Sequence, residues 1–168
     1  SGRSAGPGRA GSRHRPRRAV EGKDTLLLPK GYREWVFVGS SLGLEYSGTE
    51  EKGASDKLEF KNVYINPSAY RVFLKSGKFP DGTILVLETG KADTKHEPGL
   101  KGSYLSEFTG VSAAVKDTRR FADGWAYFGF GGKAGKLSER AQPFAKSACY
   151  DCHREKGALD NVFTQFYP

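Results

Sequence analysis

The stretch Asn66–Glu88, NPSAYRVFLKSGKFPDGTILVLE, places a helix directly before a strand and decides the fold class. Asn66 is a favourable N-cap, Pro67 takes the first helical position, and Gly77 follows the last one. This punctuation predicts a helix over residues 67–76. The turn FPDGT then leads into TILVLE, whose β-branched residues and leucines are typical of a strand.

The chain around this stretch consists mainly of expected strands. Residues 58–65 alternate apolar and polar side chains with one irregularity, and residues 103–117 alternate well enough for one or two strands. GWAYFGF, residues 124–130, is an aromatic strand, and a last helix is expected within 142–156. Residues 90–102 are expected to form a polar loop. The order predicts an α+β fold, mainly β, with an antiparallel sheet, a central helix and a C-terminal helix.

Composition predicts one domain with a leader. The six arginines of residues 1–20 account for most of the net charge of +8, so nucleic-acid binding is not expected. Residues 1–23 are expected to be a disordered basic leader or a remnant, and residues 24–168 a single domain. No apolar run approaches the roughly 18 residues of a membrane span. The chain starts with Ser and contains no Met, so we expect a trimmed N-terminus.

Both cysteines of the chain lie in one five-residue motif, Cys149-Tyr-Asp-Cys152-His153. C-x-x-C-H is the attachment sequence of c-type heme, in which two thiols form thioethers and the histidine binds iron. Residues three apart on a helical turn share a face, so both sulfurs can meet one edge of the porphyrin. The motif therefore predicts one covalent heme c, with His153 as proximal iron ligand.

Two other interpretations of the motif remain open. A thioredoxin-like dithiol expects its cysteines at the start of a helix after a buried strand, within a βαβ pattern that the sequence lacks. A zinc site needs four ligands and would have to recruit His96. Both interpretations are weaker than heme attachment.

The second axial position of the iron is expected to be open. Electron-transfer c-type cytochromes usually complete the iron with methionine, and this chain has none. His96, in the expected polar loop, and a lysine are the other candidate ligands. The apolar residues that would face such an open site are Phe60, Leu85, Leu87, Trp125, Tyr127 and Phe128. An open iron favours binding or transforming a small molecule over simple electron transport.

The segments LLLPKGYREWVFVGSS, KNVYINPSAY, SGKFPDGTILVLE, VKDTRRFADGWAYFGF and CYDCHREKGALDNVFTQFYP resemble the cytochrome P-460 family, in family order, over residues 24–168. The resemblance implies a mainly antiparallel β fold, usually a homodimer, with one high-spin c-type heme open on its distal face. It implies either hydroxylamine oxidation by enzymes that carry a lysine cross-linked to the heme, or binding of nitric oxide or carbon monoxide by cytochrome c-prime-beta relatives.

Two positions favour the gas-binding branch within this resemblance. Leu87 stands where the enzymes carry the cross-linking lysine, and Ser112 where they carry a distal carboxylate. With Phe60, these residues are the expected distal pocket. A shifted alignment would bring Lys91 or Glu88 into this pocket instead.

We expect a periplasmic gas-binding cytochrome, with a hydroxylamine-oxidising or peroxidase-like enzyme and an electron-transfer cytochrome as alternatives. Expected partners are a diatomic or small nitrogen ligand, a redox partner cytochrome and a second copy of the chain.

Overall fold

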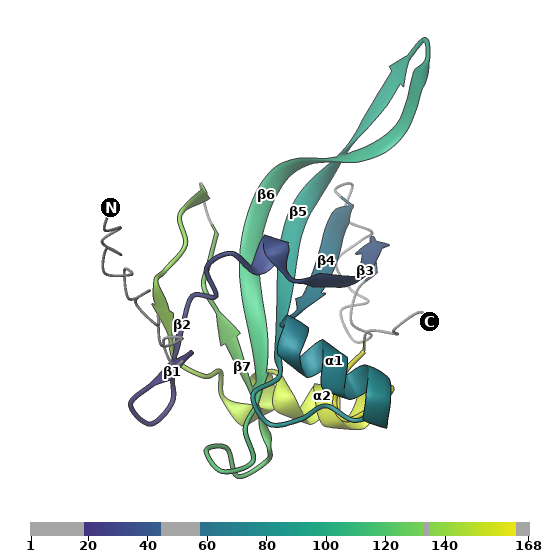
Figure 1. Cartoon of the computed structure of the whole chain (residues 1–168). Coiled ribbons are helices and arrows are strands. Elements are labelled where there is room, and N and C mark those ends of the chain that lie inside the picture. The colour runs from purple at the N-terminus through teal and green to yellow at the C-terminus, as the bar shows by residue number, and fades with distance from the viewer. Residues whose placement is uncertain (1–18, 45–57, 133–134, 164–168) are drawn as a thin grey trace, which may run out of the picture.

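The computed structural model describes residues 19–44, 58–132 and 135–163. Two antiparallel sheets and two helices make up the described chain, which confirms the predicted α+β, mainly β fold class (Figure 1). The smaller sheet has the order β1-β2-β8, formed by Val20–Glu21, Thr25–Leu27 and Arg140–Ala141. The larger has the order β3-β4-β5-β6-β7, formed by Val36–Leu42, Glu59–Ile65, Ile84–Glu97, Leu100–Lys116 and Trp125–Gly129. The helices are α1, Pro67–Ser76, and α2, Tyr150–Lys156, and the 3-10 turns are η1, Tyr32–Glu34, and η3, Lys146–Ala148.

The predicted central helix is confirmed with its predicted bounds. Gly77 adopts the left-handed conformation with φ 66°, and its N–H donates to the carbonyl of Phe73 at 2.7 Å, which ends α1. Asn66 does more than start the helix. Its Oδ1 accepts a hydrogen bond of 2.8 Å from the backbone N–H of Ile84, so the start of α1 is tied to the start of β5.

The body of the five-stranded sheet is covered on both faces. On one face, Ile84, Val86 and Phe128 belong to a buried cluster that includes Leu26 of the smaller sheet. On the other face, Leu85 and Tyr127 pack in a second cluster with α1, Cys149 and Tyr150. The other buried members of this cluster include Ile65, Ala69, Phe79 and Trp125. The sheet therefore separates a β layer from a helical layer, and the C-x-x-C-H turn lies on the helical side.

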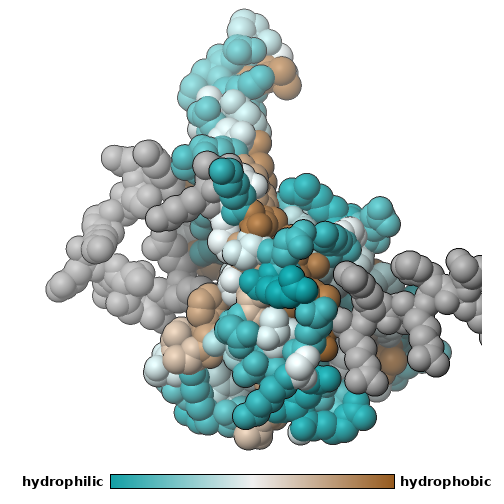
Figure 2. Space-filling model, turned by 90° about the vertical axis from the view of Figure 1, so that its left-hand side faces the viewer, coloured by the Kyte–Doolittle hydropathy of each residue, from teal (hydrophilic) through white to brown (hydrophobic). Residues whose placement is uncertain are grey.

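The expected polar loop at residues 90–102 is wrong. β5 and β6 continue as a paired hairpin through Glu97 and Leu100, and this arm rises from the sheet away from the helices (Figure 1). Figure 2 shows the arm as a mainly hydrophilic projection with isolated hydrophobic residues. Both faces of the arm are exposed, so its sequence lacks the apolar alternation by which half-buried strands are recognised.

The end of the expected leader is part of the described structure. Residues 20 and 21 form β1, which pairs with β2 through Val20↔Leu26 and Glu21↔Thr25. Residues 1–18, with all six arginines, lie outside the described residues.

Candidate functional site

The two cysteines lie on one turn at the start of α2. Cys149 is the N-cap residue, Cys152 follows one turn later, and both thiols are half-buried. The backbone N–H of His153 donates to the carbonyl of Cys149 at 3.1 Å, which closes this turn. The helical spacing places both sulfurs along one side of α2, as the motif predicts.

The imidazole of His153 is held on two sides by aromatic rings and through one nitrogen. Its ring centroid lies 4.3 Å from that of Tyr127 and 4.5 Å from that of Phe163. Nδ1 lies 2.9 Å from the carbonyl oxygen of Asn161, an acceptor, so Nδ1 carries the proton. Burial lowers the pKa of His153, although the bond to Asn161 opposes this shift. Burial favours a neutral imidazole and the bond to Asn161 favours its proton on Nδ1, the form in which a histidine binds a metal through Nε2.

The carbonyl that orients His153 comes from a tight turn after α2. Asp160 and Asn161 both adopt left-handed conformations, with φ 47° and 63°, between the bridged residues Leu159 and Val162. Two positive φ values in succession are typical of a type I′ turn, in which Asp and Asn are favoured. The turn thus aims a backbone carbonyl at the ring of the preceding helix.

Side chains of the sheet hold this turn in place. Asp160 accepts hydrogen bonds from the indole Nε1 of Trp125 at 3.2 Å and from Nζ of Lys116 at 2.5 Å. The hydroxyl of Tyr127 donates to the carbonyl of Asn161 at 3.3 Å. The orientation of His153 is therefore determined by β6 and β7 as well as by its own helix.

The structure brings Leu87 and Ser112 together and separates them from Phe60. Leu87 lies directly opposite Ser112 on β6 and Val63 on β4, on the helical side of the sheet. Phe60 lies opposite Gly90, on the face turned to the smaller sheet. Among the other expected facing residues, Leu85, Trp125 and Tyr127 lie on the helical side and Phe128 on the opposite side.

Glu88 and Lys91 are each engaged away from Leu87. Buried Glu88 accepts a short hydrogen bond from the hydroxyl of Tyr32, and its carboxylate pairs with Arg33 at 2.7 Å and 2.6 Å, on the face opposite Leu87. Nζ of Lys91 lies 2.6 Å from Glu107 at the base of the arm. The residues directly opposite Leu87, Val63 and Ser112, are uncharged.

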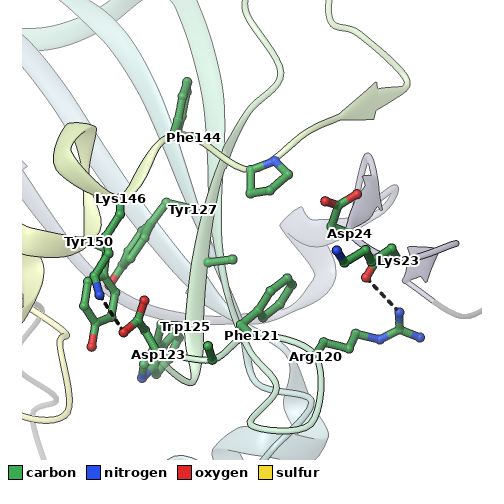
Figure 3. A pocket seen from close by; sticks show the side chains of 13 residues that line it. Lys23, Asp24, Arg120, Phe121, Asp123, Trp125, Tyr127, Phe144, Lys146 and Tyr150 are labelled. Atoms are coloured by element: carbon green, nitrogen blue, oxygen red, sulfur yellow. Dashed lines mark hydrogen bonds and ion pairs between the residues drawn. The ribbon is translucent and has the colours of Figure 1, made fainter.

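A cavity of about 230 Å³ adjoins the attachment turn, which is the C-x-x-C-H turn of residues 149–153, at the outer edge of β7 (Figure 3). Tyr127 and Tyr150 line it, but neither cysteine nor His153 does. Its rim carries mixed charges, including an ion pair of 2.7 Å between Lys146 and Asp123. The cavity lies beside the attachment turn and is separate from the ligating atoms.

The two weaker interpretations of the motif find little support in this geometry. Burial, with a smaller contribution from Cys152, raises the pKa of the Cys149 thiol, whereas a reactive dithiol needs a lowered one. His96 is exposed near the end of the arm and lies far from α2 (Figure 1). Within residues 19–44, 58–132 and 135–163, no three His, Cys, Asp or Glu side chains gather as a metal site.

The residues present fit a covalently attached heme. The site offers two thiols on one turn, a neutral imidazole held through Nδ1, and an adjoining row of half-buried residues on the sheet: Val63, Leu87 and Ser112. Such a row can pack against an apolar group that the chain itself does not supply. Asp160 and Asn161 were missed from the sequence, although the dipeptide Asp-Asn after Gly157 is a turn signal.

Comparison with known proteins agrees with this geometry. A search of curated proteins finds no match, whereas the family model described as Cytochrome P460 matches residues 29–164, most of the chain. The match includes α1, Leu87, Ser112 and the whole C-x-x-C-H turn. Membership in this family supports a heme-binding cytochrome of the c type. The chain belongs to the cytochrome P460 family.

Proposed function

We propose that the protein is a mono-heme c-type cytochrome that binds small gases such as nitric oxide or carbon monoxide. Cys149 and Cys152 form the thioethers, and His153 is the proximal and single protein ligand of the iron. A heme bound here supplies an iron centre that can take a small ligand on the face opposite the histidine. The residues of this chain orient the histidine and form an apolar lining.

One observation carries this proposal. Tyr127, which contacts His153, belongs to one row of the sheet, and the next row on the same face is formed by Val63, Leu87, Ser112 and Gly129. This second row contains no histidine, methionine, lysine or carboxylate. An uncharged row of this kind suits an uncharged diatomic ligand, since it offers a charged ligand little compensation for lost hydration. The absence of methionine from the chain agrees with it.

The enzyme alternative is tested by turnover and by spectrum. A heme-loaded sample that oxidises hydroxylamine with an artificial electron acceptor would reject the gas-binding assignment. A strongly red-shifted Soret band in the reduced protein would reveal a heme cross-linked to lysine, with the same consequence. We expect neither, because Leu87 cannot form the cross-link and Ser112 is no carboxylate.

An electron-transfer cytochrome is the third alternative. It needs a sixth ligand, and His96, its candidate, lies on the arm, away from His153 (Figure 1). A redox partner cytochrome would still be needed to keep the iron ferrous, the state that binds carbon monoxide.

We place the protein in the periplasm, because covalent attachment of c-type heme takes place outside the cytoplasm. In the described part of the chain, no helix has the length and apolar character to span a membrane. Expression with and without an export signal tests this placement. Heme should be found on the chain only when the protein is exported.

We propose a homodimer formed through the arm. A two-stranded ribbon is only marginally stable alone in water, and this one exposes Leu100, Tyr104 and Leu105. Residues 91–107 contain three lysines and three acidic residues, so two arms can associate without net repulsion. Analytical ultracentrifugation should show a dimer that Leu105→Lys dissociates, and an unchanged monomer in both proteins would reject this interface.

A further inference from the structure

A carboxylate and two hydroxyls form a hydrogen-bonded chain across β4, β5 and β6. Oγ1 of Thr109 lies 2.7 Å from Oε1 of Glu59 and 2.8 Å from Oγ1 of Thr89. All three side chains are half-buried. Glu59 lies at the start of β4, where its carbonyl accepts a hydrogen bond from the N–H of Gly43 and where it pairs with Lys91 of β5.

This chain of groups lies on the same face of the sheet as Leu87. β4 and β5 pair in regular register from Glu59 to Ile65, so Glu59 and Thr89 share a face with Val63 and Leu87. Thr89 lies two residues after Leu87 on β5, about 7 Å farther along the strand and on the side away from α2. The hydroxyl is thus at the rim of the proposed ligand pocket.

A β-bulge turns Thr109 toward this face. Thr89 is paired with Gly110 and the next residue, Gly90, with Phe108, so Thr109 is the extra residue of β6. Bulges re-aim side chains and are frequent near functional sites. Gly132 makes the bulge possible, because a Cβ there would lie 2.2 Å from the carbonyl oxygen of Thr109 and its φ is 152°.

The direction of the hydrogen bonds follows from the donors available. A carboxylate only accepts, so the single proton of Thr109 points to Glu59. Thr89 can then donate to Thr109 at 2.8 Å, a shorter contact than its other one, to the carbonyl of Gly110 at 3.4 Å, and its oxygen lone pairs are left as acceptors. The chain therefore presents an acceptor, backed by a carboxylate, to whatever lies at the rim.

We propose that Glu59, Thr109 and Thr89 form a relay that accepts a proton from small ligands bearing O–H, N–H or another acidic hydrogen. The ligand's proton passes to Oγ1 of Thr89 as the hydroxyl proton of Thr89 passes to Thr109. The proton of Thr109 passes to Glu59, which becomes a neutral acid and later releases the proton to solvent. The relay would extend the ligands of this pocket from neutral diatomic gases to molecules that bind only after losing a proton.

The charged residues near Glu59 are two lysines and one further glutamate. Lys91 of β5 lies opposite Glu59 of β4 in the strand register, and its side chain forms an ion pair with Glu107. Lys61 lies two residues after Glu59 on the same face of the sheet. β3, on the other side, brings the apolar or uncharged residues 42–44. Glu107 lies at the same rim but outside the relay, and so offers a matched control.

Two ligands with different protons provide the test. At neutral pH hydrogen cyanide must lose its proton to bind ferric heme as cyanide, whereas carbon monoxide binds ferrous heme without a proton. Stopped-flow association of both is measured on the heme-loaded protein and on Glu59→Gln, Thr109→Val and Glu107→Gln. Circular dichroism confirms that each variant is folded.

We expect Glu59→Gln and Thr109→Val to slow cyanide association at least about tenfold and leave carbon monoxide association within about twofold, since general bases typically contribute more than this. Glu107→Gln should change neither rate. Unchanged cyanide rates in Glu59→Gln and Thr109→Val, or equal slowing of both ligands, would overturn the relay. The inference rests on the proposed function, whose own failure looks different: the parent protein would then bind neither ligand.

Discussion

The Nδ1 atom of His153 and the carbonyl oxygen of Asn161 lie 2.9 Å apart, and this contact links the proposed proximal ligand to the turn after α2. Asn161 sits in a turn that Trp125 and Lys116 hold through Asp160. A hydrogen bond from the second ring nitrogen fixes the tautomer and orientation of a metal-bound histidine and raises its basicity. In the site that we propose, the sheet therefore controls the strength of the bond between His153 and the heme iron.

Replacing Asp160 should weaken this control in graded steps. Asp160→Asn keeps a residue that tolerates positive φ and an acceptor for Trp125, but loses the charge opposite Lys116. Asp160→Ala loses the tolerance of positive φ, the acceptor for Trp125 and the charge opposite Lys116. We expect destabilisation of less than about 1 kcal/mol for Asn and about 2 kcal/mol for Ala. The iron–histidine stretching frequency, measured by resonance Raman, should fall in the same order; equal frequencies in all three proteins would contradict the argument.

Gly157 is needed where α2 ends against the turn. A Cβ at this position would lie 2.5 Å from the carbonyl oxygen of His153 and 2.8 Å from the backbone of Asn161, and neither atom can move aside without shifting the site. Gly157→Ala should destabilise the protein by about 1–3 kcal/mol in chemical denaturation.

Gly129→Ala is the matched control for that substitution. Its Cβ would also lie 2.5 Å from a neighbour, but this neighbour is the tip of the Phe144 ring, which is 48% exposed and can rotate away. The Gly129 variant should lose less stability than the Gly157 variant. The reverse order would show that backbone crowding at Gly157 is not the limiting contact.

Tyr32 should make the protein sensitive to alkali. Burial first, and then the hydrogen bond to Glu88, raises the pKa of Tyr32 well above its ordinary value near 10. The folded state thus binds this proton more tightly than the unfolded state. The resulting stabilisation is complete below about pH 10 and is lost progressively as the pH rises above it.

Tyr32→Phe tests this dependence. The variant should lose about 1 kcal/mol near neutral pH, because Glu88 loses a donor, yet its stability should fall less steeply above pH 10. Burial also raises the pKa of Tyr64, so part of the decrease in stability above pH 10 should remain. A decrease in stability above pH 10 that Tyr32→Phe leaves unaltered would reject the assignment.

What the sequence predicted correctly was encoded locally. The bounds of α1 follow from Asn66, Pro67 and Gly77, and the helical turn that carries Cys149 and Cys152 follows from their spacing. In both cases neighbouring residues on one turn contain the information. Leu87 and Ser112 were placed by resemblance to a family, and the register of β5 and β6 sets them opposite each other.

What it did not predict depends on long-range pairing. The apolar residues of β4 change face between Phe60 and Val63, and only the register with β5 shows which of the two points to the helices. The arm has two exposed faces and hence no alternation. The acceptor for His153 is a backbone carbonyl, which no side-chain pattern displays.

The central claim is that the iron is held by His153 on one side and is open on the other. Titration of the reduced, heme-loaded protein with carbon monoxide, followed by absorption, tests it most directly. We predict a high-spin spectrum before the titration and binding of one carbon monoxide per heme. A low-spin reduced spectrum that carbon monoxide leaves unchanged would contradict the account.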